Sequence, residues 1–288
     1  LKNKKFTTTK INNKDYAVYK KIDSDIFIRY DQYRVFDFYI IGVEKGGTTS
    51  LLSNLSKHPD IYMAKPKSHP GGEMHYFNYQ LTKLNRNRKW LKSQFNYKKK
   101  IVGAKNPNII YLPYTHQYMS HINPYVKMIL VLRNPIDRAY SEWHMFNKKS
   151  NFVKNTGNFK SFEDSINEEL KFRLNEPPNF YVANYHHLQR GLYYKQIKNL
   201  LKHFPMQNLL ILLNEDLKNK EKETYEKIYK FLNVKIKHNN YQIKLEGSYS
   251  KNEKEKDISK KLKTKMEDFF KPDIKKLEKL LNIKTNWF

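Results

Sequence analysis

Residues 36–50 read Phe-Asp-Phe-Tyr-Ile-Ile-Gly-Val-Glu-Lys-Gly-Gly-Thr-Thr-Ser, and this stretch decides the fold. An apolar segment leads into a glycine-rich turn, and a Thr-Thr-Ser helix start follows it. A strand, loop and helix in this order aim backbone N–H groups and a helix N-terminus at an anion, usually a phosphate. The stretch therefore predicts an anion-binding loop between a buried strand and a helix.

The spacing of this loop narrows the choice of ligand. A loop that binds a nucleoside triphosphate reads G-x-x-x-x-G-K-[S/T]. Gly42 and Gly47 have the right separation, but Thr48 follows the second glycine, and the lysine lies earlier, at Lys45. The lysine that reaches the β- and γ-phosphates of ATP is missing, so the loop predicts a nucleotide other than a triphosphate. A tight turn with a Thr/Ser helix cap and no ligand is the alternative.

The composition is that of a folded and strongly basic chain. Its 288 residues are 39% hydrophobic and 15% aromatic, which argues against disorder and is enough for one large domain or two small ones. The formal net charge of +27 suggests a polyanionic partner, although solvated surface lysines account for most of it. No apolar run has the length of a membrane span. Without cysteine the chain has no disulfide, thiolate metal site or cysteine nucleophile.

Strands and helices alternate along most of the chain. Residues 1–34 are polar and irregular and predict an N-terminal extension, whereas residues 35–288 predict one domain. The alternation predicts an α/β fold with a central parallel sheet flanked by helices. Residues 251–281 read as two helices broken at Pro272. Strands are expected at 37–42, 61–64, 101–105, 126–132 and 209–213, and further helices at 49–57, 90–95, 134–146, 162–174, 191–204 and 225–232.

A second anion site is predicted from residues 132–141, Leu-Arg-Asn-Pro-Ile-Asp-Arg-Ala-Tyr-Ser. Arg133 comes at the carboxyl end of a buried strand, and Ser141 lies inside the helix that follows. An arginine fork and a hydroxyl can bind a separate phosphate. Pairing of Arg133 with Asp137 is the alternative. Ligands bind beyond the carboxyl ends of parallel strands, so this segment should converge with the glycine-rich loop.

A candidate general base lies in residues 72–78, Gly-Glu-Met-His-Tyr-Phe-Asn. Glu73 and His75 are two residues apart, so an extended chain would place them on one face. Either side chain could accept a proton from a substrate. A surface glutamate next to a half-buried histidine is the alternative.

Together these segments resemble the sulfotransferases that use 3′-phosphoadenosine 5′-phosphosulfate (PAPS). Residues 42–51 look like the family's 5′-phosphosulfate loop, and residues 133–141 look like its 3′-phosphate motif. Residues 73–77 are similar to the Glu-x-His-Phe-Phe stretch of the heparan sulfate branch, where the glutamate is taken as the base. The resemblance runs from about residue 36 to the C-terminus, with weaker matches at 190–193, 204–205, 211–217 (as a strand) and 269–287.

The resemblance implies PAPS as the co-substrate, with no metal required because PAPS has no γ-phosphate. Lys45 would neutralise charge as the 5′-phosphate leaves. The 5′ end would be bound by Lys45, Gly46, Gly47, Thr48, Thr49 and Ser50, and the 3′-phosphate by Arg133 and Ser141. Tyr193 is a candidate for the adenine pocket or a core residue. Gly247, Ser248 and Tyr249 occupy the place of a loop that closes over the nucleotide, although they depart from the family's Lys-Gly pattern.

On the acceptor side, the resemblance implies sulfuryl transfer to a hydroxyl or amine, with a glycan as the expected acceptor. Glu73 would take the acceptor proton. His75 is the alternative base, because the small-molecule branch of the family uses histidine. Lys105 matches an acceptor-side lysine of the glycan branch, or it is a solvated lysine at a strand end.

Two other functions compete with this one. A P-loop-like nucleotide or small-molecule kinase is disfavoured by Thr48 at the lysine position. A basic nucleic-acid-binding protein is supported by charge alone, because no basic and aromatic recognition motif stands out, so no specific nucleic acid is expected. The absence of cysteine favours the cytoplasm. The alternative is the Golgi lumen, with a membrane anchor upstream of residue 1.

Overall fold

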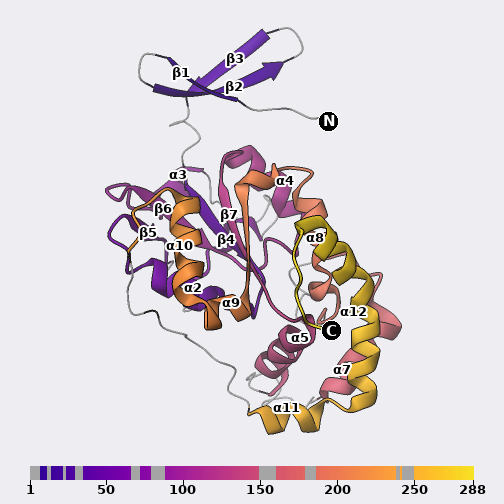
Figure 1. The fold of residues 1–288 in the computed structure, drawn as a ribbon. Helices are drawn as coiled ribbons and strands as arrows, with labels where there is room; N and C mark the ends of the chain where they lie inside the picture. Colours follow the sequence, from indigo (N-terminus) through magenta and orange to yellow (C-terminus); the bar gives the residue numbers. More distant parts are fainter. Residues whose placement is uncertain are drawn as a thin grey trace.

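Five parallel strands form the sheet at the centre of the computed structural model (Figure 1). The structure describes residues 7–11, 14–21, 24–29, 35–65, 72–78, 88–148, 160–178, 186–237, 241 and 250–288. The strand order is β5-β6-β4-β7-β8, and every neighbouring pair is parallel. The predicted parallel sheet is confirmed. Its strands are β4 (Phe38–Gly42), β5 (Ile61–Met63), β6 (Ile101–Lys105), β7 (Lys127–Leu132) and β8 (Leu209–Leu213).

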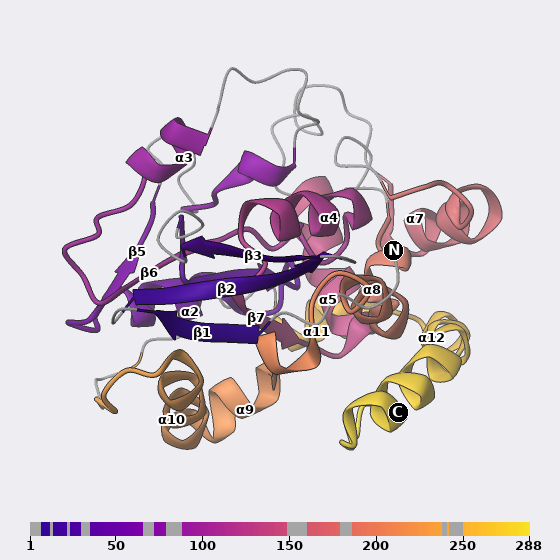
Figure 2. The same ribbon diagram turned by 90° about the horizontal axis from the view of Figure 1, so that it is seen from above.

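Both faces of this sheet are covered, so the central strand β4 is buried along its whole length. Successive side chains of a strand point to opposite faces. Tyr39 and Ile41 accordingly lie in one hydrophobic core, and Phe38 and Ile40 lie in the other. The first core is completed by α4 (Pro113–Ile122), α5 (Pro135–Trp143), α8 (Tyr193–Leu200) and α12 (Lys260–Leu281), and the second by α2 (Thr48–Leu55), α9 (Asn214–Asn219) and α10 (Glu221–Leu232) (Figures 1 and 2).

The strand order creates a switch point beside β4. From β4 the chain passes through α2 to β5 and β6 on one side, and it later reaches β7 and β8 on the other. Open parallel sheets bind ligands at the carboxyl ends of strands where the order reverses. The fold therefore brings the ends of β4, β6 and β7 to one edge.

The C-terminal helices differ from the prediction at Pro272. The expected break at this proline is wrong: α11 (Lys251–Asp257) ends before Ser259, and α12 continues through Pro272. The Ser259 hydroxyl caps α12 by accepting a hydrogen bond from the backbone N–H of Leu262. Pro272 is exposed, so water can satisfy the carbonyl that lost its helical donor, while the apolar stripe Leu262, Met266, Phe270, Ile274 and Leu277 stays buried.

Other elements also differ from the prediction made from the sequence. The weakly matched strand at 211–217 ends at Leu213, and α9 begins at the next residue. The helix α4, which starts at Pro113, was not predicted. Residues 1–34, expected to be irregular, include the antiparallel strands β1 (Thr7–Ile11), β2 (Lys14–Lys21) and β3 (Ser24–Arg29). Main-chain pairing between neighbouring segments builds this small sheet in spite of their polarity.

Most remaining helices lie where they were expected, with shifted ends. They include α3 (Arg88–Ser93), α7 (Phe162–Glu168) and α10. Two helices continue into a π-helical turn: α5 into His144–Lys148, and α7 into Glu169–Arg173. In the part of the chain that the structure describes, no helix combines the length and the apolar character needed to span a membrane.

Candidate functional site

The glycine-rich loop, residues 42–50, joins β4 to α2 at the edge where β4 ends. Lys45 and Gly47 both have positive φ angles, 67° and 100°. A Cβ atom on Gly46 would lie 2.6 Å from the carbonyl oxygen of Val131 in β7. The backbone of the loop therefore packs against the neighbouring strand in a way that only glycine permits at this position.

The loop ends at a helix N-terminus that no side chain caps. The N-cap residue of α2 is Gly47, which has no side chain to offer, and the first turn contains no acidic residue. The first N–H groups of a helix have no partner within the helix, and its dipole favours an anion there. Thr48, Thr49 and Ser50 form this first turn, so a helix N-terminus without a side-chain cap lies where the sequence predicts an anion-binding loop.

Lys45 is the cation of the loop. Its Nζ atom lies 3.5 Å from the Sδ atom of Met145. Burial lowers the pKa of Lys45, the neighbouring carboxylates of Glu44 and Glu142 oppose this shift, and the Arg133 guanidinium adds to it. A half-buried cation near a helix N-terminus without an acidic residue suits a multiply charged anion, which would restore the pKa of Lys45 by pairing with it.

Arg133 meets the glycine-rich loop directly. Its Nη1 atom donates a hydrogen bond to the carbonyl oxygen of Lys45, at 3.0 Å. The predicted convergence of the two anion motifs is therefore confirmed. Ser141, on α5, is buried at 3% exposure. Asn134 caps α5 through hydrogen bonds that its side chain accepts from the N–H groups of Ile136 and Asp137.

Tyr193 lies beneath Arg133, in the first turn of α8. Its hydroxyl donates to the carbonyl oxygen of Arg133 at 2.8 Å, and its ring is almost fully buried. The ring of Trp287 packs edge-on against it, with centroids 5.9 Å apart. Trp287 also donates from Nε1 to Glu215, and its carbonyl oxygen accepts from Asn134 at 3.4 Å. The C-terminal segment thus braces the Arg133 side of the site.

Glu73 joins the same edge through β6. It forms an isolated parallel bridge with Lys105, the last residue of that strand. Its carboxylate lies 3.3 Å from Lys105 Nζ and 3.2 Å from His75 Nε2. Lys105 is fully buried and also donates to the Thr49 hydroxyl at 3.1 Å. Glu73, His75, Lys105 and the first turn of α2 are therefore one continuous group of contacts.

A chain of amides fixes the protonation of His75. The backbone N–H of Asn108 donates to Asn106 Oδ1, so the Nδ2 group of Asn106 faces Asn78 and donates to its Oδ1 at 2.6 Å. Asn78 then presents its own Nδ2 to His75 Nδ1 at 2.7 Å. The Nδ1 atom must accept, so the proton is on Nε2 and is donated to Glu73.

Glu73 is held as a carboxylate. Burial would raise its pKa, but the hydrogen bond from His75 and the charge of Lys105 outweigh burial and leave the pKa below its ordinary value. About a quarter of the side chain is exposed, so solvent reaches the carboxylate. The group is thus ionised at neutral pH and accessible.

A buried ionic network lies behind the glycine-rich loop. Arg190 pairs with Glu44 and with Glu142, the latter at 3.2 Å. Arg138 and His187 contact the same Glu142 carboxylate at 3.1 and 2.9 Å. Burial alone would raise the pKa of Glu142, but the two guanidinium groups hold it far below its usual range. The network connects Glu44, the residue before Lys45, to Glu142 in α5 and to Arg190 in the turn that precedes α8.

Several of these residues escaped the sequence analysis. Asn214, directly after β8, donates to the carbonyl oxygen of Gly46 at 2.9 Å. Asn78 is the last residue of the motif at 72–78, and Arg138 and Glu142 lie in or beside the second motif, but the sequence predicted no role for them. Their i,i+4 spacing on one helix was the available signal. Gly247, Ser248 and Tyr249, predicted to close over the nucleotide, lie outside the described residues.

The glycine-rich loop, Arg133 and the carboxylate of Glu73 thus meet at one edge of a parallel α/β sheet. Residues 36–279 match the family model described as the sulfotransferase domain. The chain belongs to this family.

Curated relatives belong to the heparan sulfate branch. The chain is 27% identical over 198 residues to the mouse heparan sulfate glucosamine 3-O-sulfotransferase 3B1, covering 68% of this chain and 45% of the relative. It is 24% identical over 269 residues to the human heparan sulfate glucosamine 3-O-sulfotransferase 5, covering 86% of this chain and 72% of that protein. The chain thus spans about half the length of the first relative.

Solved structures show the same fold. A sulfotransferase from Alicyclobacillus acidocaldarius aligns with a TM-score of 0.68 and 24% identity, covering 87% of this chain and 98% of that one. The mouse sulfotransferase SULT7A1, crystallised with 3′-phosphoadenosine 5′-phosphate (PAP), aligns with a TM-score of 0.51 and 14% identity, covering 89% and 94%.

Proposed function

We propose that this chain transfers a sulfuryl group from PAPS to a hydroxyl or amine of a carbohydrate. The observation that carries the proposal is the contact between Arg133 and the carbonyl of Lys45, because it unites two anion motifs beside Glu73. Two separated anion sites suit a donor with phosphate groups at opposite ends of one adenosine. The heparan sulfate relatives support a glycan acceptor.

The residues of the loop fit such a donor. The uncapped start of α2 offers backbone N–H groups of Gly47, Thr48 and Thr49 to the 5′-phosphate. Lys45 and Lys105 bring positive charge to the same end, and Arg133 with Ser141 would bind the 3′-phosphate. PAPS, when bound, supplies a sulfuryl group on a phosphate leaving group. Lys45 would neutralise the charge that develops on this phosphate.

On the acceptor side, Glu73 is the base. It takes the acceptor's proton as the acceptor oxygen or nitrogen bonds to sulfur and the bond from sulfur to the bridging oxygen breaks. His75 cannot do this in the observed arrangement, because its Nε2 proton is donated to Glu73 and its Nδ1 atom accepts from Asn78. His75 is therefore a positioning residue that aims the carboxylate. Lys105 holds the opposite oxygen of Glu73.

The competing functions have less support. A kinase would need a cation at the position of Thr48, whose side chain is buried in the first turn of α2. Nucleic-acid binding rests on the net charge alone. The cellular compartment stays a prediction.

A thermal-shift experiment tests the proposal. PAP should raise the unfolding temperature of the chain in a concentration-dependent way, because a ligand that binds only the folded state stabilises it. ATP with Mg²⁺ is the matched control and should give a much smaller shift. Equal shifts, or a shift with ATP–Mg²⁺ alone, contradict the PAPS assignment.

A further inference from the structure

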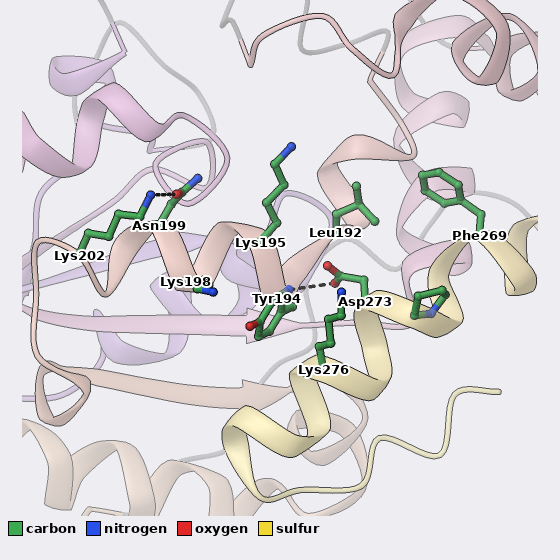
Figure 3. Close-up of a pocket in the computed structure, with 10 residues that line it drawn as sticks. Leu192, Tyr194, Lys195, Lys198, Asn199, Lys202, Phe269, Asp273 and Lys276 are labelled. Carbon is green, nitrogen blue, oxygen red and sulfur yellow. Dashed lines mark hydrogen bonds between the residues drawn. The ribbon is translucent and has the colours of Figure 1, made fainter.

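A groove of about 440 Å³ lies between α8 and α12, apart from the residues of the glycine-rich loop and of Glu73 (Figure 3). This volume is in the range of sites for small ligands and short chain segments. Tyr194 and Lys195 come from α8, and Phe269 and Lys276 come from α12. None of the groove residues takes part in the proposed reaction.

The groove is strongly basic. Lys195, Lys198 and Lys202 follow at i, i+3 and i+7, so they lie on one side of α8 and the turn after it, and Lys276 faces them from α12 (Figure 3). The sequence of α8 contains no acidic residue that could pair with them. Among the residues that the structure describes, Lys195, Lys198 and Lys276 have no ion pair. Like charges at this spacing repel one another, and an anion would relieve the repulsion.

The one carboxylate of the groove is already engaged. Asp273 accepts a hydrogen bond from the backbone N–H of Tyr194 at 2.9 Å, drawn as a dashed line in Figure 3. The carboxylate of Asp273 thereby stabilises the N-terminus of α8, where the helix dipole favours a negative charge. Four lysines face this single acid, so the groove keeps a net positive charge.

The surface between the lysines is apolar. Leu192, Tyr194 and Phe269 are partly exposed there, and Lys198 Nζ lies 5.7 Å from the centre of the Tyr194 ring. A sugar ring presents apolar C–H faces and carries its sulfate or carboxylate groups at the edge, which matches a cationic rim over an apolar floor. The groove has no arginine, the residue whose fork suits phosphate and nucleic acid.

We propose that this groove binds a segment of a sulfated or carboxylated oligosaccharide, as a second glycan site besides the acceptor position at Glu73. The inference rests on the proposed function, because a glycan sulfotransferase works on chains of this chemistry. Tyr193, the neighbour of Tyr194, donates to the carbonyl of Arg133, so α8 begins at the donor site and continues along the groove.

Calorimetric titration with a fully sulfated hexasaccharide from heparin tests the site. The triple variant Lys195→Gln/Lys198→Gln/Lys276→Gln should lose affinity about tenfold, which corresponds to roughly 0.5 kcal/mol for each charge contact. The matched control is Lys222→Gln/Lys227→Gln/Lys230→Gln on α10, which removes the same charge from exposed lysines and should change affinity less than about twofold. Equal losses in the two variants overturn the proposal.

Two further measurements distinguish a failure of the groove proposal from a failure of the proposed function. PAP should stabilise the groove variant as much as the parent chain. If PAP fails to stabilise either protein, the proposed function fails, and the groove is still judged by the hexasaccharide titrations. A single-stranded oligonucleotide of equal charge should bind the parent chain and the groove variant alike. If the groove substitutions weaken oligonucleotide binding as much as hexasaccharide binding, the groove is a general polyanion site and the glycan assignment is wrong.

Discussion

Arg133 donates a hydrogen bond from its guanidinium to the carbonyl oxygen of Lys45 at 3.0 Å, across 88 positions of the chain. The contact joins the residue directly after β7 to the loop that follows β4. Because β4 and β7 are adjacent and parallel, their carboxyl ends reach the same edge of the sheet. Had the two cations faced different sides of the sheet, one bisphosphorylated nucleotide could not have bridged them.

The substitution Lys45→Ala should abolish most turnover and weaken nucleotide binding. The lysine provides charge at the leaving phosphate, and the loss of one such contact commonly costs about 10²–10³ in rate. Sulfuryl transfer from PAPS and the thermal shift with PAP measure the two effects. Lys222→Ala, on an exposed part of α10, is the control and should change neither. Normal turnover in Lys45→Ala contradicts the role of the loop.

The substitution Glu73→Ala should remove most turnover but leave PAP binding intact, because Glu73 acts on the acceptor. His75→Gln keeps a side-chain N–H donor and should retain much more activity than Glu73→Ala. Initial rates at saturating PAPS distinguish the two variants. If Glu73→Ala works at the parent rate while His75→Gln is inactive, histidine is the base and our assignment is reversed.

The pH profile should report the pKa of Glu73, which lies below its ordinary value in the folded chain. His75→Phe removes a hydrogen bond that favours the carboxylate, so the pKa of Glu73 rises and the acidic limb of kcat/KM moves to higher pH. The depressed pKa also adds stability above the unfolded-state pKa, and this is lost as pH falls through the folded-state value. An unmoved acidic limb in His75→Phe would count against the contact.

The substitution Arg190→Leu should destabilise the fold by about 3–5 kcal/mol, because it removes the buried guanidinium that Glu44 and Glu142 share. Glu142 keeps Arg138, but the largely buried carboxylate of Glu44 loses its arginine partner. Urea unfolding at neutral pH measures the loss. Arg173→Leu is the matched control: this arginine also has two carboxylate partners, but it is 27% exposed and should cost less than about 1 kcal/mol. Similar losses of unfolding free energy in Arg190→Leu and Arg173→Leu would mean that the burial of the Arg190 network does not matter for stability.

The substitution Trp287→Ala should lower stability by about 1–2 kcal/mol, since it removes a ring contact with Tyr193 and a hydrogen bond to Glu215. PAP should also stabilise this variant less, because Tyr193 supports the backbone of Arg133. Trp287→Phe keeps an aromatic ring against Tyr193 and should retain most of the stabilisation by PAP. Thermal unfolding with and without PAP is the measurement, and an unchanged PAP shift in Trp287→Ala would separate the C-terminal segment from the donor site.

The strands of the parallel sheet were readable from the sequence because each is a short apolar run bounded by turn residues, whereas the polar strands β1, β2 and β3 were not. The continuous run at 126–132 is an example, since both of its faces are buried. Helix ends were less readable. Pro272 lies inside α12 because its position on the exposed side leaves the apolar stripe intact, and a local rule for proline cannot see which side faces solvent.

The sequence by itself determined the strands of the parallel sheet, the glycine-rich loop with its lysine at position 45, and the arginine that follows a buried strand, because these are patterns among near neighbours. Only the tertiary structure decided how distant groups act together. Asn78 fixes the proton of His75, Glu142 is shared by two buried arginines, and Asn214 holds the loop. Such contacts depend on strand adjacency and burial, which give a side chain its partners and its pKa.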